Sequence, residues 1–292
     1  MELRHVRYFV ATAEAGTVSG AAARLHLTQP GLSRQLRQLE KDLGVALFDR
    51  SAGRMELSTT GRALLPQARD LLHRADALRV AASFHALGRL ERLTIGAPTV
   101  TLTDVVAPFI ATLAPDDPTI DVLGADGRNP ADTLRLGADL AIGTIPASPP
   151  LHQMPLAVLP VWAYVPAGHP WAGRTGVALA ELLDESLILL PPTFTARQSL
   201  DAASSDRSYG TVIEAANGTV AQALAAAGRG IAVASDDPRF GLIPLAVETG
   251  GHRLSIRLRA VWDSRHAAAA TIEDFAARLG RFIRDRYHVP VS

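Results

Sequence analysis

One segment near the start of the chain, residues 29–43, limits the possible folds more than any other. Its leucines recur at helical spacing, which predicts a helix with one apolar face formed by Leu32, Leu36, Leu39 and Leu43. Pro30 suits the first turn of this helix, because its missing N–H would have no intrahelical partner there. The opposite face carries a short polar group followed by basic ones, namely Ser33, Arg34, Arg37 and Lys41.

Two roles fit a helix with such a polar face. Most amphipathic helices of globular proteins turn their polar face to solvent. A helix that enters the major groove of DNA also needs short polar groups near its N-terminus to reach base edges, and arginines to neutralise phosphate or read guanine. The helix alone is compatible with both roles, and the neighbouring segments help to distinguish them.

The segments on either side of this helix indicate a winged helix-turn-helix. A first helix ends at Gly16, and a short second helix, which Thr17 or Ser19 can cap, runs through Leu25. Alanines at 21–23 are small enough for a close crossing between helices. After Gly44, an apolar strand, a Gly-containing turn and a returning strand predict a hairpin whose basic residues are Arg50 and Arg54.

These residues also carry a family resemblance. Residues 21–40, followed by 43–50 and 57–61, resemble the signature of LysR-type transcriptional regulators over about 60 continuous residues. The resemblance implies that the helix beginning at Gln29 enters the major groove, with its first residues closest to the bases. The expected DNA-binding residues are Thr28, Gln29, Pro30, Ser33, Arg34, Arg37, Arg50 and Arg54.

Residues 59–87 predict one long helix that Gly88 ends. Its apolar residues alternate four- and three-residue steps, which makes a heptad seam. The seam fits a dimer interface that holds two winged helices at the spacing of DNA half-sites, or a face packed on the helix's own domain. Pro66 removes one backbone hydrogen bond and predicts a bend early in the helix. The residues expected to dimerise are Leu64, Leu71 and Leu78.

From residue 92 onward the pattern changes to apolar strands that alternate with helices, which predicts an α/β domain with largely parallel sheets. Such sheets bind small ligands at the carboxyl ends of their strands, where helix N-termini offer N–H groups to anions. Each polar residue in these turns also fits a plain helix cap. The residues expected to bind a small effector are Thr99, Thr101, Arg128, Phe194, Thr195, Asn217 and Thr219.

The resemblance extends to this half through residues 139–143 and 225–233. It implies a two-lobed effector domain like a periplasmic binding protein, with the chain crossing between lobes near residue 161 and returning near residue 264. The expected fold is α+β and multidomain, with a winged helix-turn-helix at 1–60, a linker and dimerisation helix at 61–88, and a two-lobed α/β effector domain at 92–292. Lobe 1 would comprise about 92–160 and 264–292, and lobe 2 about 161–263.

Composition and charge narrow the function further. The chain has no cysteine, which excludes a disulfide framework, a thiolate zinc site, an iron–sulfur cluster and a cysteine nucleophile. Its nine histidines form no H-E-x-x-H pair, and it has no G-x-S-x-G elbow or phosphate loop, so we expect no enzyme, no metal and no cofactor.

The two halves of the chain differ in charge. Residues 1–92 hold 14 basic and 9 acidic residues, a net of +5, whereas residues 93–292 hold 15 and 20, a net of −5. This split suggests a basic module for a polyanion joined to an acidic module with another role.

We therefore expect a LysR-type regulator whose binding to operator DNA is modulated by a small molecule in the cleft of the effector domain. A small-molecule-binding protein and a DNA-binding architectural protein without effector are the alternatives; the basic wing counts against the first, and the acidic α/β half against the second. The expected partners are double-stranded DNA, an effector for which a carboxylate is one candidate class, further copies of the chain in a dimer or homotetramer, and RNA polymerase as an additional candidate. The chain has neither a signal-peptide h-region nor a long apolar run, which predicts a cytoplasmic protein without membrane contact.

Overall fold

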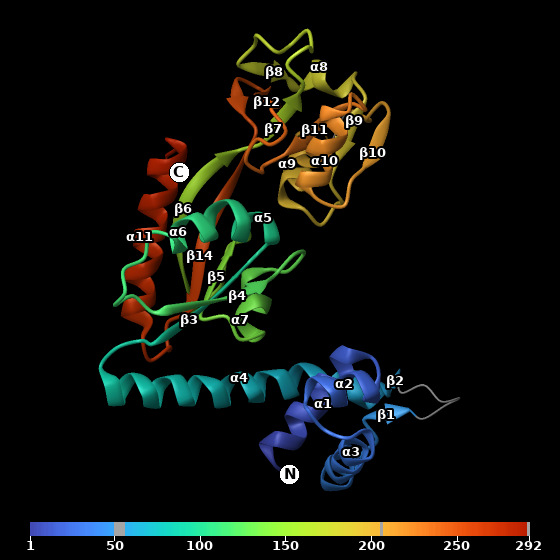
Figure 1. Cartoon of the computed structure of the whole chain (residues 1–292), viewed down its shortest axis with the longest axis vertical. Helices are drawn as coiled ribbons and strands as arrows, with labels where there is room; N and C mark the ends of the chain where they lie inside the picture. The colour runs from blue at the N-terminus through green and yellow to red at the C-terminus, as the bar shows by residue number, and fades with distance from the viewer. Residues whose placement is uncertain (50–55, 205–206, 291–292) are drawn as a thin grey trace. The chain divides into compact units, whose positions relative to one another are not determined.

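The computed structural model describes residues 1–49, 56–204 and 207–290. Two compact units divide the chain, the first built on Met1–Gly88 and the second on Arg89–Leu134 and Ala138–Ser292 (Figure 1).

Three helices open the first unit: α1 Leu3–Ala15, α2 Val18–Arg24 and α3 Gln29–Leu43. The third helix has the bounds expected from its leucine stripe, and the second ends one residue earlier than expected. Gly16 ends α1 in the left-handed conformation, with φ 67°, where a residue without a Cβ is favoured. Thr17 caps α2 by accepting a hydrogen bond from the backbone N–H of Gly20 at 3.1 Å.

A short hairpin and a common core complete the winged helix-turn-helix. Strands β1 Phe48–Asp49 and β2 Glu56–Leu57 pair antiparallel. Phe9 of α1 packs against Phe48 edge to face, with ring centroids 5.6 Å apart. Three members of the expected stripe form the centre of the core, since Leu32, Leu36 and Leu39 are fully buried. The fourth, Leu43, is 40% exposed because it is the last residue of the helix, beyond the packed core.

The linker forms one helix, α4 Thr59–Leu87, which contains Pro66. Ser58 caps it by accepting a hydrogen bond from the N–H of Gly61 at 2.8 Å, and Gly88 ends it at φ 66°. Gly61 is needed here because an added Cβ would lie 2.0 Å from the carbonyl oxygen of Leu47. The start of α4 therefore sits directly on the backbone that leads into the hairpin.

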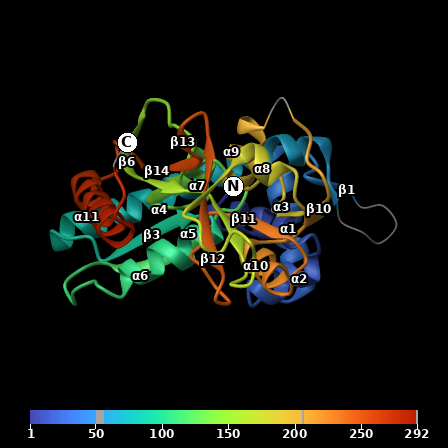
Figure 2. The same cartoon turned by 90° about the horizontal axis from the view of Figure 1, so that it is seen from above.

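The second unit has two lobes, each around one sheet (Figures 1 and 2). Lobe 1 has the strand order β4-β3-β5-β14-β6, from Thr119–Gly124, Arg92–Ala97, Leu140–Gly143, Ser255–Asp263 and Leu151–Pro160. Its helical segments are α5 Thr99–Thr101, the π-helical turn η1 Leu102–Val106, α6 Ala107–Ile110, α7 Pro130–Arg135 and α11 Ala269–Tyr287. In both views α11 runs alongside β6.

Lobe 2 has the strand order β10-β9-β11-β7-β12-β13, and β8 pairs with β12. The strands, from β7 to β13, are Trp162–Val165, Gly176–Ala178, Leu187–Leu189, Val212–Glu214, Ile231–Ala234, Ile243–Thr249 and His252–Arg253. Its helices are α8 Leu179–Leu183, α9 Thr195–Ala203 and α10 Gly218–Ala226.

The chain crosses between the lobes at Val161, which separates β6 in lobe 1 from β7 in lobe 2, but it returns earlier than expected. The chain returns at Leu254, ahead of residue 264, since β14 pairs with β5 and β6 and so belongs to lobe 1. The N–H of Val161 donates to the carbonyl of Leu254 at 2.9 Å, which ties the two crossings together.

The sheets are also mixed rather than largely parallel. β3 runs parallel to β4 and β5, but β14 is antiparallel to both of its neighbours. In lobe 2, β7 is likewise antiparallel to β11 and β12. The antiparallel members are strands that lead to or from a crossing, whose direction is set by the passage between lobes and not by a strand–helix–strand repeat.

Candidate nucleic-acid interface and ligand cleft

The first candidate site is the outward face of α3. Thr28 caps the helix by accepting a hydrogen bond from the N–H of Gly31 at 3.2 Å, and Pro30 lies in the first turn. Because Leu32, Leu36 and Leu39 are buried, the side chains on the opposite side of the helix face outward. An open, shallow surface is lined by Thr28, Pro30, Gly31, Arg34, Arg37, Gln38 and Lys41.

The basic side chains on this face make no ion pair within the described part of the chain. Arg34 is exposed, and its guanidinium has no ion pair with any residue in the described part of the chain. Arg37 donates from Nε to the carbonyl of Ser33 at 3.3 Å, which leaves its two terminal nitrogens outward. Gln29 is exposed and Ser33 is partly exposed on the same helix. The face can therefore offer both hydrogen-bonding groups and cations to a polyanion.

Sequence analysis placed Lys41 on this face but did not include Gln38 or Lys41 among the DNA contacts. Gln38 donates to Asp42 at 2.8 Å one turn further along the helix. Its place four residues after Arg34 is the signal that could have found it.

The hairpin of the wing is anchored to α3. Glu40 accepts hydrogen bonds from the N–H groups of Leu47 and Phe48 at 2.9 and 3.2 Å, which ties the last turns of α3 to the first strand. The expected contacts Arg50 and Arg54 lie outside the described residues.

The expected dimerisation residues divide into two environments along α4. Leu64 is partly buried and packs against the core of its own unit. Leu71 and Leu78 are 39% and 72% exposed. Leu64 and Leu71 also line an apolar groove of about 220 Å³ with Phe9 and Leu39.

The second candidate site is a cleft of about 220 Å³ in the second unit, lined by both lobes. It brings together four of the expected effector contacts: Thr101, Arg128, Phe194 and Thr195. Thr101 is only 6% exposed, and its hydroxyl has no hydrogen-bond partner among the described residues. Arg128 is exposed at the cleft, and within the described ranges its guanidinium pairs with no carboxylate. Both groups are thus free to bind a ligand.

The other three expected contacts do not line this cleft. Thr99 donates from its backbone N–H and its hydroxyl to Asp126, at 2.8 and 2.5 Å. Asn217 caps α10 by accepting from the N–H of Val220 at 2.9 Å, and Thr219 lies in the first turn of that helix. In this structure Thr99 and Asn217 are occupied with hydrogen bonds inside the protein.

The cleft also contains polar residues that sequence analysis missed, namely Thr144, Ser235 and Asp236. Thr144 directly follows β5, and the other two directly follow β11. The rule that ligands bind beyond the carboxyl ends of strands points to these positions, but only the fold shows that the ends of β5 and β11 reach the same cleft.

Asp236 is the most perturbed of these groups. It is 5% exposed, and its carboxylate lies against α10 so closely that a Cβ on Gly218 would come within 2.1 Å of it. Burial, followed by the nearby charge of Asp104, raises the pKa of Asp236 to about 6. Arg239, whose guanidinium is 3.9 Å away, lowers the pKa, but by less than burial and Asp104 raise it.

The described residues contain neither a group of metal ligands nor a membrane-spanning helix. Within 1–49, 56–204 and 207–290, no three His, Cys, Asp or Glu side chains are grouped so that they could hold a metal ion. Across the same ranges, no helix is both long enough and apolar enough to cross a membrane.

Comparison with known proteins matches both units to family models. A model described as a bacterial regulatory helix-turn-helix protein of the lysR family matches residues 3–62. A model described as the LysR substrate binding domain matches residues 88–283.

Individual proteins resemble the chain over much of its length. The HTH-type transcriptional regulator TfdT of Cupriavidus pinatubonensis is 35% identical over 199 residues, which cover 65% of this chain and 86% of that protein. A probable hydrogen peroxide-inducible genes activator of Mycobacterium leprae is 31% identical over 315 aligned positions, which cover 97% of this chain and 95% of that protein. A crystal structure of full-length CbnR complexed with its target DNA has a TM-score of 0.65 at 23% identity, and the match covers 98% of this chain and 99% of that one. At that identity the likeness is one of fold.

Proposed function

This chain belongs to the LysR family of bacterial transcriptional regulators, and on that premise we propose that it binds a specific operator through α3 and responds to a small effector in the cleft of its second unit. The family models confirm the resemblance seen in the first 60 residues and in the second half of the sequence. The named relatives are regulators. We propose that this chain likewise has no catalytic role, and that it acts in the cytoplasm, where the DNA is.

The observation that carries the proposal is the outward face of α3. Arg34 and Arg37 face away from the core without a carboxylate partner in the described residues, next to Ser33 and the exposed Gln29. In the major groove, an arginine can read guanine with two parallel hydrogen bonds, while neighbouring basic groups neutralise phosphates. The proposed base contacts are Gln29, Pro30, Ser33 and Arg34, with Thr28, Arg37, Arg50 and Arg54 at the backbone or groove edge.

Pairing of two chains through α4 completes the proposed DNA-binding form. Two half-sites on one face of DNA require two winged helices at a fixed spacing. The exposure of Leu71 and Leu78 supports a second copy of α4 as their cover, and Leu64 would link that seam to the core of its own unit. We propose a dimer through this seam and a dimer of dimers as the full assembly, with RNA polymerase as a further partner at the promoter.

For the effector we propose a small carboxylate. Arg128 supplies an unpaired cation at the cleft, and the hydroxyl of the nearly buried Thr101 supplies an unused hydrogen-bonding group. Thr195, in the first turn of α9, offers a further hydroxyl, and Phe194 contributes apolar surface. Three further residues would support these contacts indirectly by holding the strand-to-helix turns in place, namely Thr99, Asn217 and Thr219.

The proposed control is allosteric. A ligand that contacts both lobes favours one arrangement of the lobes over others only if it binds them with different affinity. The lobe arrangement would then change how the paired winged helices are presented to the operator.

Binding to DNA tests the proposal directly. Purified protein is mixed with its own upstream intergenic region and with genome-wide selected fragments, with excess competitor DNA, over a salt series. We expect a complex that protects two half-sites and weakens steeply as salt rises, because phosphate contacts release counterions. Absence of any specific complex at low salt, on all of these fragments, would contradict the regulator function.

The effector is tested on the operator complex once it is found. A panel of aliphatic and aromatic carboxylates is compared with the corresponding neutral amides, using wild type and Arg128→Gln. We expect the active acids to change the footprint in wild type only, and the amides to have no effect. Equal responses to acids and amides would exclude a carboxylate held by Arg128.

A further inference from the structure

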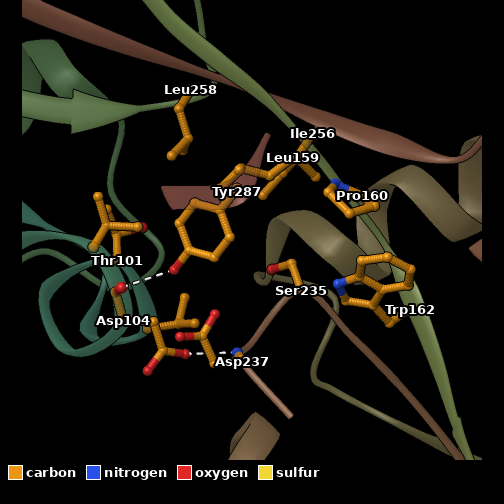
Figure 3. Close-up of a pocket in the computed structure, with 12 residues that line it drawn as sticks. Thr101, Asp104, Leu159, Pro160, Trp162, Ser235, Asp237, Ile256, Leu258 and Tyr287 are labelled. Atoms are coloured by element: carbon orange, nitrogen blue, oxygen red, sulfur yellow. Dashed lines mark hydrogen bonds between the residues drawn. The ribbon is translucent and has the colours of Figure 1, made fainter. Parts of the chain in front are cut away.

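The two lobes of the second unit are joined at one edge by a group of charged and polar residues, which we call the latch. Lobe 1 contributes Asp104 from the π-helical turn η1, and Arg286 and Tyr287 from the end of α11. Lobe 2 contributes Asp237 and Arg239 from the segment between β11 and β12. In Figure 3, the dashed lines join both Tyr287 and Asp237 to Asp104.

Asp104 is the centre of the latch. Its Oδ2 accepts a hydrogen bond from the N–H of Asp237 at 2.9 Å, and its Oδ1 accepts from the guanidinium of Arg239 at 2.5 Å. Asp104 is only 7% exposed, so these charge-assisted bonds are largely shielded from water. One carboxylate from lobe 1 thus binds both the backbone and a side chain of lobe 2.

The end of α11 makes the second connection. Arg286 donates to the Oδ2 of Asp237 at 2.9 Å, across the two lobes. Tyr287 donates from its hydroxyl to the backbone carbonyl of Asp104 at 2.8 Å, within lobe 1. Asp237 is therefore held from two elements of lobe 1, and those two elements are held to each other.

The lobe 2 side of the latch is fixed to its own lobe. Gln222 of α10 is fully buried, donates to the carbonyl of Asp237 at 3.0 Å, and accepts from the N–H of Arg239 at 2.7 Å. The guanidinium of Arg239 also donates to the carbonyl of Asp237 at 2.9 Å. These bonds attach the segment to α10, so the latch connects helices of the two lobes and not only two loops.

Beside the latch the lobes are not packed tightly. A cavity of about 60 Å³ lies among Thr101, Asp104, Asp237 and Tyr287 on one side and Leu159, Pro160 and Trp162 near the crossing on the other (Figure 3). A well-packed core leaves few voids of this kind. At this edge, polar contacts rather than a continuous apolar core hold the lobes together.

The latch also shares a helical segment with the ligand cleft. Thr101, whose hydroxyl is free in the cleft, lies three residues before Asp104, and η1 begins immediately after it. Single π-helical turns are uncommon and occur often at functional positions. A ligand that binds Thr101 therefore acts on the segment that carries the centre of the latch.

We propose that the latch sets the relative position of the two lobes in the ligand-free protein, and that a ligand held at Thr101 acts on that position through η1. The second part rests on the proposed effector site, whereas the first part depends on neither DNA nor a ligand.

The test measures the distance between the lobes in the absence of any ligand. Because the chain has no cysteine, two can be introduced without background: Glu273→Cys on α11 and Ala223→Cys on α10, both at exposed positions. Nitroxide labels on these sites give a distance distribution by double electron–electron resonance. Subunit exchange with an excess of unlabelled protein leaves one labelled copy per assembly, so that only distances within one chain are measured.

We expect one narrow distribution in the labelled parent, and a shifted or broadened distribution when Asp104→Asn removes the charge at the centre. Arg286→Gln, which removes only the contact to Asp237, should give a smaller change of the same kind. The matched control is Asp121→Asn, which breaks the ion pair with Arg92 inside lobe 1 and should leave the distribution unchanged.

Circular dichroism melts establish that each variant is folded. If Asp104→Asn does not fold, the distance distribution of Arg286→Gln tests the proposal instead. The side chain of Arg286 is 39% exposed, so its replacement should not prevent folding. Distributions identical to the parent in every folded latch variant would overturn the proposal. A change equal to that of Asp121→Asn would overturn it as well. Failure of the operator experiment leaves this measurement unaffected, so the two proposals can fail separately.

Discussion

Two amphipathic helices, α3 and α11, carry arginines on their polar faces, but the two sets have different partners. On α3, Arg34 and Arg37 meet no carboxylate in the described part of the chain. On α11, Arg278 makes a two-point ion pair with Asp117, and Arg286 pairs with Asp237. The acidic partner of Arg278 lies 161 positions away in the sequence.

The presence or absence of a carboxylate partner determines whether an arginine can bind another anion. A guanidinium already bound to a carboxylate in two places has given up much of its capacity for another anion. A guanidinium without an acid keeps that capacity for phosphate or guanine. The two helices look alike in sequence, and only the acids that the fold brings to α11 separate a structural role from a binding role.

The largest expected effect concerns Asp236, a buried carboxylate whose ion pair with Arg239 is long, at 3.9 Å. Burial raises the pKa of Asp236 to about 6, whereas the group titrates near 3.8 when exposed. An acid with a raised folded pKa binds its proton more tightly in the native state, so stability falls as pH rises from about 4 to about 6. Because the shift is about two pKa units, wild type should lose roughly 3 kcal/mol relative to Asp236→Asn in total, about two thirds of it between pH 4 and pH 6.

Urea unfolding of wild type and Asp236→Asn at several pH values between 4 and 7 measures this difference. Ionisable groups far from Asp236 contribute equally in both proteins and cancel in the comparison. Parallel stability curves would mean that the carboxylate of Asp236 is not buried as described. The contrast with Asp117, which Arg278 binds tightly, would then no longer hold.

The next effect tests whether the arginines of α3 are free for DNA. Arg34→Ala should weaken specific operator binding by about 1–3 kcal/mol, or roughly 5- to 150-fold, without lowering the melting temperature. Arg281→Ala is the matched control, since Arg281 is an exposed arginine on α11 and should not affect operator affinity. Fluorescence anisotropy with labelled operator measures both. Equal affinities for Arg34→Ala and wild type would remove Arg34 from the interface.

The parts of this structure that depend on neighbouring residues could be predicted from sequence. The leucine stripe, Thr28 and Pro30 fix α3 locally, and Gly88 ends α4 where expected. Recognition of the family added the two lobes, although it placed the return crossing near 264 instead of at Leu254, because strand periodicity does not show which sheet a strand joins. The polar lining was only partly predicted for the same reason. Thr101 and Arg128 were expected, while Asp236 becomes part of the cleft only when lobe 2 brings the end of β11 to it.

The smallest expected effect comes from the carboxylate that α11 does hold. The guanidinium of Arg278 is the main cause that lowers the pKa of Asp117 to about 2, so the ionised form is favoured in the folded state. An acid with a lowered folded pKa stabilises the protein above its unfolded pKa, near 3.8, and this contribution is lost as pH falls toward 2. Because Arg278 is 39% exposed, screening by water reduces the gain, and Asp117→Asn should cost about 1 kcal/mol at neutral pH.

The neighbouring Asp116→Asn removes the same charge from an exposed position and should have a smaller effect. Unfolding curves at pH 7 and near pH 2.5 should show the cost of Asp117→Asn at the higher pH and its near loss at the lower. If Asp116→Asn and Asp117→Asn cost the same at pH 7, the contact with Arg278 contributes nothing specific, and the arginines of α3 and α11 differ only in position.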